Sequence, residues 1–264
     1  MNGDSEGSGR GPGLPAESRG TGKGPGLPAE STGTGGGPGL LAVRDLGLVD
    51  YRAARDIQRQ VHADVLAGRC PHTLLLLEHP PVYTFGRRGG REHLLRAPAE
   101  LEAMGACLVD SDRGGLVTFH GPGQLVGYPI LRLGRLRVSL SQYVERLLDA
   151  LRTTLADHGL SCDAVDMARP GLFVEGRKLA SVGVRLSHGV TLHGFAVNLS
   201  PDLSWFAHIV PCGLAGVSAT SVRAELGASP EPSAFGVRAA LMLAARLGLS
   251  CSADAAATGR ASES

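Results

Sequence analysis

Apolar residues recur with helical spacing after Asp50, and the pattern has clear start and stop signals. The residues spaced three to four apart are Tyr51, Ala54, Ile57, Val61 and Val65. Asp50 is a favourable residue for capping a helix amino terminus, and Gly68 suits the left-handed position that ends a helix. The pattern predicts an amphipathic helix between these two residues.

Two further segments have the same period. Ser139 and Gln142 form a capping box in front of an apolar stripe, and Gly159 ends that helix. The stripe consists of Val144, Leu147, Leu148, Leu151 and Leu155. Residues Ala234 to Leu247 predict a third helix that is apolar on more than one side and therefore more deeply packed.

Seven short apolar runs predict strands. They are Leu74 to Leu77, Val82 to Phe85, Leu116 to Phe119, Leu125 to Leu131, Leu172 to Glu175, Lys178 to Leu186 and Val190 to Leu199. Only the short connections GR and SHG separate the last three, which indicates antiparallel pairing. Because strands and helices do not alternate regularly, we expect an α+β domain with a mixed β-sheet flanked by helices.

Composition divides the chain into a tail and a folded domain. Residues 1–39 hold 14 of the 38 glycines and contain a 13-residue repeat that begins at Gly11 and again at Gly24. Such a segment buries too little apolar surface to offset its chain entropy, so we expect disorder over residues 1–39. The tail lacks an apolar stripe and makes a poor transit peptide or secretory signal. The folded domain is expected over residues 40–250, with a disordered tail over residues 251–264.

Charge and cysteine content narrow the class of protein. The formal net charge is +1, which provides no strong field for nucleic acid or an anionic membrane surface. The longest apolar runs are far shorter than the roughly 20 residues that cross a bilayer. Five cysteines without a CxxC pair favour reduced thiols over a disulfide framework or a structural zinc site.

Three stretches place glycines and polar side chains where regular elements avoid them. The first is RGGLVTFHGPGQ from Arg113 to Gln124. Its glycines let the backbone approach a ligand closely, and Thr118 and His120 fall on the same side of a strand. A tight turn followed by a strand with a hydrogen-bonded histidine is the ordinary structural alternative.

The second stretch, GRKLASVG from Gly176 to Gly183, carries Lys178 next to apolar neighbours, which indicates an ammonium held near the interior. A solvated lysine at a hairpin tip is the alternative. The third, WFAHIVPCGL from Trp205 to Leu214, holds Cys212 between proline and glycine, as expected of an accessible nucleophile in a rigid turn. Such a thiol needs a nearby cation to form thiolate, and Lys178 could supply it. A buried, inert cysteine is the alternative.

The spacing of residues along the sequence leaves other reactions open, among them hydrolysis by a cysteine and a histidine base. A cysteine hydrolase would use His120, His193 or His208 as its base, and sequence spacing does not choose among them. The chain has no HExxH pattern and no GxxxxGKS or GxGxxG phosphate loop, so we expect neither a metal site nor nucleotide chemistry.

The segments RGGLVTFHGPGQ, GRKLASVGVR, TLHGFAVN and WFAHIVPCGL, in this order and spacing, resemble the octanoyltransferases of lipoate synthesis. This lipoyl(octanoyl) transferase family is called LipB in bacteria. The resemblance runs from about Leu46 to Gly248. It implies a catalytic domain of the biotin/lipoate protein ligase type and no cofactor.

The resemblance also implies a reaction. Octanoyl passes from acyl carrier protein to an enzyme cysteine and then to the lysine of a lipoyl domain, in E2 subunits of 2-oxoacid dehydrogenases or in the glycine cleavage H protein. Cys212 matches the acyl-bearing cysteine, and Lys178 matches the residue that lowers its pKa. Substrate contacts fall on Arg113, Gly114, Gly115, Leu116, Val117, Thr118, Phe119 and His120, on Ser181, Val182 and Gly183, and on Gly194, Phe195 and Ala196.

The nearest alternative is an ATP-dependent lipoate or biotin protein ligase of the same fold, which has no need of Cys212. Two alternatives are more distant. One is a non-catalytic relative that only binds carrier or lipoyl domains, and the other is a cysteine thioesterase. The extra tail is compatible with a mitochondrial enzyme, and the bacterial cytoplasm is the alternative location.

Overall fold

The computed structural model describes residues 39–163, 170–210 and 217–253. The chain separates into two units, Met1–Gly37 and Pro38–Ser264, and every described element belongs to the second. Within the described ranges, no helix combines the length and the apolar character needed to cross a membrane.

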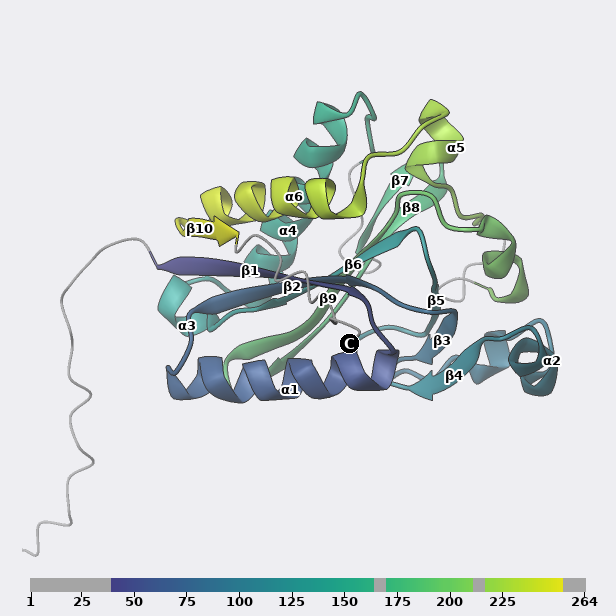
Figure 1. The fold of residues 1–264 in the computed structure, drawn as a ribbon, viewed down its shortest axis with the longest axis horizontal. Helices are drawn as coiled ribbons and strands as arrows, with labels where there is room; N and C mark the ends of the chain where they lie inside the picture. Colours follow the sequence, from purple (N-terminus) through teal and green to yellow (C-terminus); the bar gives the residue numbers. More distant parts are fainter. Residues whose placement is uncertain (1–38, 164–169, 211–216, 254–264) are drawn as a thin grey trace, which may run out of the picture. The chain divides into compact units, whose positions relative to one another are not determined.

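A seven-stranded mixed sheet is the frame of this unit (Figure 1). Its order is β10-β1-β2-β6-β9-β8-β7; β1 pairs in parallel with β2 and β10, and the other pairs are antiparallel. The strands are β1 (Leu40–Leu48), β2 (His72–Glu78), β6 (Gln124–Ile130), β7 (Gly171–Val174), β8 (Arg177–Ser187), β9 (Val190–Asn198) and β10 (Ser250–Ala253). The predicted antiparallel pairing of the last three runs is confirmed by β7, β8 and β9.

A smaller sheet of three strands stands beside the first. Its order is β4-β3-β5, with β3 (Val82–Phe85), β4 (Cys107–Asp110) and β5 (Val117–His120). Tyr83, Phe119 and Val117 form its own apolar cluster with Leu101 of α2 (Pro98–Ala103) and with Ile209. The two sheets therefore have separate cores.

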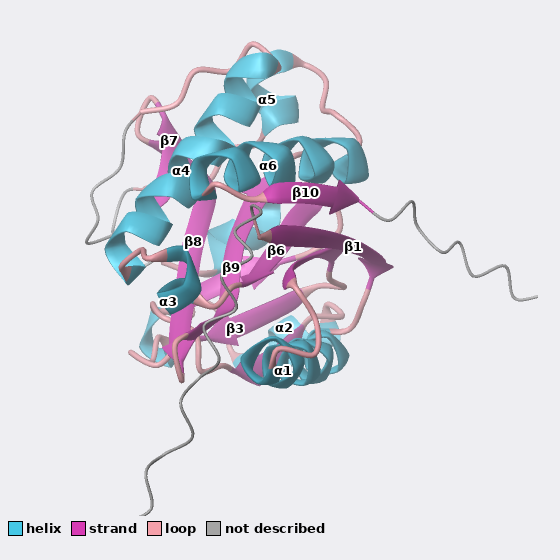
Figure 2. Cartoon of the chain, turned by 90° about the vertical axis from the view of Figure 1, so that its left-hand side faces the viewer, coloured by secondary structure: helices cyan, strands magenta, loops and turns pink. Residues whose placement is uncertain are grey.

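Helices cover both faces of the large sheet. In Figure 2, α4 (Leu140–Asp157) and α6 (Pro232–Leu247) lie over one face, and α1 (Tyr51–Ala67) crosses the other. Leu74 and Leu76 belong to the cluster under α4 and α6, whereas Leu75 and Leu77 belong to the cluster under α1. A strand that is buried on both faces needs no polar alternation, which explains the uninterrupted leucines. Shorter helices are α3 (Leu133–Leu136), α5 (Val222–Leu226) and two 3₁₀ turns, η1 (Arg91–His93) and η2 (Leu203–His208).

The three predicted helices are present, and their caps act as expected. The Asp50 carboxylate accepts the backbone N–H groups of Arg52 and Ala53, and Gly68 is left-handed with φ 73°. Ser139 and Gln142 make the reciprocal capping box of α4. On α1, however, the buried position next to Ala54 is Gln58, and Ile57 is only half-buried. The buried side-chain oxygen of Gln58 accepts a hydrogen bond from the backbone N–H of His193 in β9, which satisfies this polar group.

Three strands were not predicted. β1, β4 and β10 owe their strand conformation to partners distant in sequence, and such pairing leaves no local signature. Ser250, Cys251, Ser252 and Ala253 pair with β1, so the folded part extends three residues past the expected boundary at residue 250.

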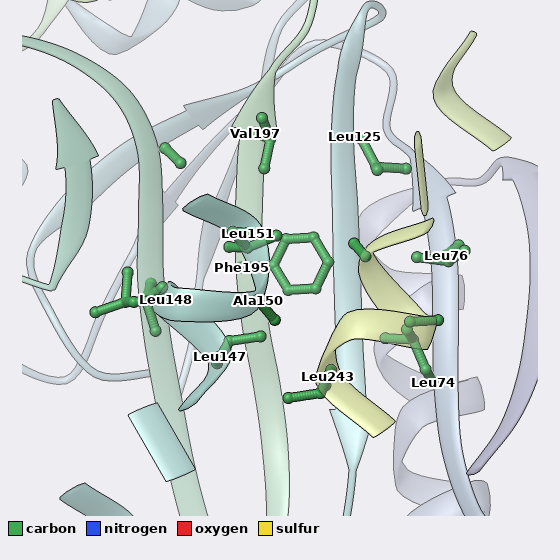
Figure 3. Packing of buried hydrophobic residues seen from close by; sticks show 14 of the residues in the cluster. Leu74, Leu76, Leu125, Leu147, Leu148, Ala150, Leu151, Phe195, Val197 and Leu243 are labelled. Carbon is green, nitrogen blue, oxygen red and sulfur yellow. The ribbon is translucent and has the colours of Figure 1, made fainter. Parts of the chain in front are cut away.

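The main core lies between the large sheet and the α4 and α6 layer (Figure 3). The ring of Phe195 from β9 sits among Leu147 and Leu151 of α4 and Leu243 of α6. A Cβ atom on Gly127 of the neighbouring strand would lie 2.1 Å from this ring, so only glycine fits there. Close packing of this kind fixes the strand positions that carry the site on the opposite face.

We expect Leu243→Ala to lower the free energy of unfolding by about 2–5 kcal/mol, because Leu243 is fully buried in this core. Leu241 of the same helix is 43% exposed, so Leu241→Ala is the matched control, with an expected change within about 0.5 kcal/mol. Urea unfolding followed by circular dichroism measures both. Equal losses in the two variants would contradict the assigned core.

Candidate active site

A cavity of about 390 Å³ opens on the face of the large sheet that α1 covers. Its floor includes Val126, Tyr128 and Ala196, which belong to the apolar cluster under α1. The residues assigned to substrate contact by sequence line this cavity, with the exception of Phe119. Phe119 points into the core of the small sheet, where its ring stacks on Trp205 with centroids 5.3 Å apart. The cavity thus gathers three segments that are far apart in the chain.

Lys178 reaches this cavity because of an irregularity in β8. Leu172 pairs with Ala180 and the next residue, Phe173, pairs with Lys178, so Leu179 is an extra residue in β8. Leu179 and Ala180 both pack in the core under α4 and α6. In a regular strand, Lys178 would follow Ala180 into that core; the bulge turns Lys178 to the cavity face. The side chain of Lys178 is buried and lines the cavity.

Backbone hydrogen bonds fix Lys178 against residues 218–220. The Lys178 N–H donates to Ser218 O at 2.8 Å, and Thr220 N–H donates to Lys178 O at 2.9 Å. The ammonium nitrogen lies 5.6 Å from the centroid of the Phe173 ring. Cys212 itself lies outside the described residues.

Arg113 is a buried guanidinium that holds the first glycine stretch in place. It donates to the hydroxyl and the carbonyl of Thr84 in β3 and to the carbonyls of Gly114 and Leu116. The loop after Arg113 then packs on the backbone of β8, where a Cβ on Gly183 would lie 3.0 Å from Gly114 O. Both glycines are therefore required by close backbone approach.

A hydrogen-bond chain links His120 to Lys178. His120 Nδ1 donates to Gln124 Oε1 at 2.7 Å, and Gln124 Nε2 donates to Asn198 Oδ1 at 2.8 Å. Asn198 Nδ2 donates to Thr220 O at 2.9 Å, and Thr220 is bonded to the backbone of Lys178. Burial holds the pKa of His120 well below its usual value, and His79 and Arg113 lower it further. The His120 ring is therefore neutral at pH 7.

A second buried histidine supports the floor. His79 Nδ1 donates to Val49 O at 2.7 Å, and its Nε2 accepts from the hydroxyl of Tyr128 at 2.8 Å. Burial lowers the pKa of His79 to about 4, so this ring is neutral too. The Tyr51 ring stacks on His120 with centroids 6.2 Å apart. Tyr51, His79 and His120 thus pack their rings against one another beside Tyr128 of the floor, and burial keeps the two imidazoles neutral.

His193 has an unusual backbone for a strand residue. Its φ of 58° lies in the left-handed region, although it is neither glycine nor asparagine. Its N–H donates to Gln58 Oε1 of α1 at 2.8 Å, and its Nε2 donates to Asp112 Oδ1 at 2.6 Å. The other carboxylate oxygen of Asp112 accepts from Arg185. Such strain persists only where the surrounding contacts compensate for it, as Gln58 and Asp112 do here.

The charged residues that line the cavity, among the described ones, have one sign. Arg88, Arg113 and Lys178 are cationic, and no described residue that lines the cavity is an aspartate or a glutamate. Such a site favours a thiolate, an oxyanion or another developing negative charge. His208, one of the three bases considered from sequence, lies in η2 against Arg96 and is not among the lining residues.

Sequence patterns missed several residues that complete the site. Tyr51 and Tyr128 line the cavity, and Asn198, Gln58 and Asp112 hold lining residues in place. The helical spacing predicts only a core position for Tyr51. A signal existed for Asn198, because it ends the TLHGFAVN motif, but nothing local distinguishes Gln58 or Asp112.

We expect Asp112→Asn to be less stable than the wild type at pH 7, because the amide loses the charge that pairs with His193 and Arg185. The expected loss is only about 1–2 kcal/mol, because a third of the Asp112 side chain is exposed and solvent screens the pair. His193 first, and Arg185 second, hold the pKa of Asp112 well below its ordinary value. A depressed folded-state pKa adds stability above the unfolded value, about 3.9, and this stability is lost as pH falls through the folded pKa. The difference between the two proteins should therefore be full at pH 6–7 and shrink below about pH 4.

Urea unfolding at a series of pH values measures this difference. Asp56, which is exposed in a loose pair with Arg59, provides the control Asp56→Asn, with little change at any pH. A stability difference for Asp112→Asn that stays constant down to pH 2 would show that the carboxylate charge is not the cause.

Comparison with known proteins identifies the family of this chain. The family model described as "Lipoyl protein ligase A/B catalytic domain" matches residues 50–243. An octanoyltransferase of Chloroflexus aurantiacus is 47% identical over 193 residues, which cover 72% of this chain and 86% of the relative. An octanoyltransferase of Mycobacterium tuberculosis is 48% identical over 188 residues, which cover 70% of this chain and 77% of the relative.

Solved structures agree on the fold. A lipoate-protein ligase A bound with ATP superposes with a TM-score of 0.60 at 14% identity, over 82% of this chain and 88% of that chain. A putative lipoate protein ligase from T. acidophilum gives 0.59 at 12% identity, over 82% and 88%. These likenesses confirm the expected α+β ligase-like fold. The chain belongs to the lipoyl protein ligase A/B catalytic domain family, and within that family to the octanoyltransferases.

Proposed function

We propose that this protein transfers an octanoyl group from acyl carrier protein to the lysine of a lipoyl domain, through a thioester on Cys212. The acceptors would be lipoyl domains of 2-oxoacid dehydrogenase E2 subunits and the glycine cleavage H protein. The relatives named above are octanoyltransferases, and they are bacterial. They lend no support to a mitochondrial location, and the proposal adopts the bacterial cytoplasm instead.

The position of Lys178 carries the proposal. Its side chain is 6% exposed in a cavity that is otherwise largely apolar, and its backbone is bonded to Ser218 and Thr220, six and eight residues after Cys212. A cation at this place would favour the thiolate form of a neighbouring cysteine. The surrounding apolar wall suits an alkyl chain, whose burial contributes about 0.8 kcal/mol per methylene.

The residue type supports an acid–base role for Lys178. The chain uses arginine 24 times and lysine only at Lys23 and Lys178. A guanidinium supplies charge but does not release its proton at ordinary pH, whereas an ammonium does. A buried lysine in an arginine-rich protein therefore fits a group that must both attract an anion and exchange a proton.

The proposed reaction has two steps that balance in atoms and protons. The Cys212 thiolate attacks the thioester carbonyl, the bond to the carrier sulfur breaks, and the Lys178 ammonium gives its proton to the departing thiolate. The neutral amine of the acceptor lysine then attacks the acyl-enzyme, the bond to Cys212 breaks, and Lys178 takes the proton that the new amide releases. The site returns to thiolate and ammonium, and no nucleotide is consumed.

We expect the protein, incubated with octanoyl acyl carrier protein without nucleotide, to gain the mass of one octanoyl group. Cys212→Ser should abolish the adduct, because the hydroxyl is a far weaker nucleophile at neutral pH. Cys107 is an exposed cysteine, and Cys107→Ser is the matched control that should keep the adduct. Intact-protein mass spectrometry reads both. Efficient transfer from free octanoate and ATP, without any adduct, would favour the ligase alternative, and release of octanoate despite excess lipoyl domain would favour a thioesterase.

Lys178→Arg should separate the two roles of the lysine. The variant keeps a cation, so octanoyl-enzyme should still form, more slowly. A guanidinium cannot accept the proton of the incoming amine, so we expect transfer to the lipoyl domain to fall by about 10²–10⁴-fold. Single-turnover assays of each half-reaction measure the split. Equal losses in both half-reactions would argue that Lys178 only shapes the cavity.

A further inference from the structure

The cavity extends well beyond Lys178 along two neighbouring strands. Its walls include Ser181, Val182, Gly183 and Val184 of β8 and residues 193–196 of β9. Val184 follows Lys178 by six positions, which corresponds to roughly 15–20 Å of strand. Because Val184 pairs with His193, the histidine lies at the end of the cavity remote from Lys178.

Three side chains close this remote end. The imidazole of His193 lines the cavity, Asp112 accepts from it at 2.6 Å, and Arg185 donates to the other oxygen of Asp112. Asp112 and Arg185 also line a second hollow of about 380 Å³, between α1 and the β8–β9 hairpin. The cluster of His193, Asp112 and Arg185, here named the end wall, is therefore a partition between the cavity and this outer hollow.

The end wall differs in chemistry from the rest of the cavity. Val126 and Ala196, from the cluster under α1, and Leu116 offer apolar surface to an alkyl chain, whereas the wall is a set of paired polar and charged groups. Methylenes gain free energy when they are buried against apolar groups. A chain that advanced further would have to separate Asp112 from its partners, and breaking such a pair is costly.

The backbone is strained in order to place this wall. His193 adopts φ 58°, and the ring of Tyr128 meets its imidazole edge-on with centroids 6.2 Å apart. Gln58, itself buried, is used to satisfy the displaced N–H of His193. An observed outlier that the surroundings hold in place supports a functional reason for the position of the side chain.

We infer that the end wall of His193, Asp112 and Arg185 sets the upper limit on the length of the acyl chain that the cavity accepts. This inference rests on the proposed transfer of an acyl group held near Lys178. His193 is a specificity-determining residue at the tail of the chain, and Asp112 and Arg185 are the residues that hold it.

The variant His193→Gly tests the wall directly. Glycine adopts a φ of 58° without strain, so the backbone is preserved while the imidazole is removed. We expect the ratio of kcat/KM for dodecanoyl over octanoyl acyl carrier protein to rise by about tenfold or more, since additional methylenes can then be buried. Asp112→Ala removes the hydrogen-bond partner of His193 on the side of the outer hollow and should shift the ratio in the same direction. Arg59→Ala alters the outer hollow only and should leave the ratio unchanged.

The outcomes separate this inference from the proposed function. If the wild type transfers no acyl group of any length, the proposed function fails. If the wild type transfers octanoyl and dodecanoyl equally well, or if folded His193→Gly and Asp112→Ala keep the wild-type ratio, the wall does not limit chain length. Thermal unfolding identifies a misfolded variant, and the other variant then decides.

Discussion

The extra residue Leu179 in β8 determines what the large sheet can do. A side chain in a regular strand follows the alternation of its neighbours, and Lys178 would otherwise face the core under α4 and α6. A cation there would be surrounded by leucine side chains, and the free-energy cost of removing it from water would far exceed the gain from its contacts. One inserted residue reverses the orientation, so a buried core on one face and a cationic cavity on the other share the same strand.

A second irregularity acts on the neighbouring strand. The left-handed backbone at His193 turns its imidazole toward Tyr128 and Asp112, while Phe195, two residues later, fills the centre of the core. The site therefore depends on two local departures from ideal strand geometry, one at each end of the cavity. Close packing of the opposite face maintains both departures, because the strands cannot slide into a regular register.

Polar groups in the site are satisfied by one another. The chain from His120 through Gln124 and Asn198 to Thr220 gives His120 Nδ1 and both side-chain amide nitrogens a partner, and it ends on the backbone of Lys178. Burial keeps His120 and His79 neutral, so the positive charge of the site comes from its arginines and Lys178. A network of this kind holds the reacting groups in place without further motion, which is what stabilising a developing negative charge requires.

The sequence by itself determined the helix caps at Asp50 and Ser139, the hairpins of β7, β8 and β9, the family, and the segments that line the cavity. These features depend on residues close together in the chain or on motifs with their own composition. Tertiary structure alone decided that β10 joins β1, that Gln58 is buried, that Phe119 faces the small core, and that Asp112 closes the remote end of the cavity. Each of these depends on a partner tens to hundreds of residues away, and a carboxylate or an amide has no local pattern that identifies the group it will meet.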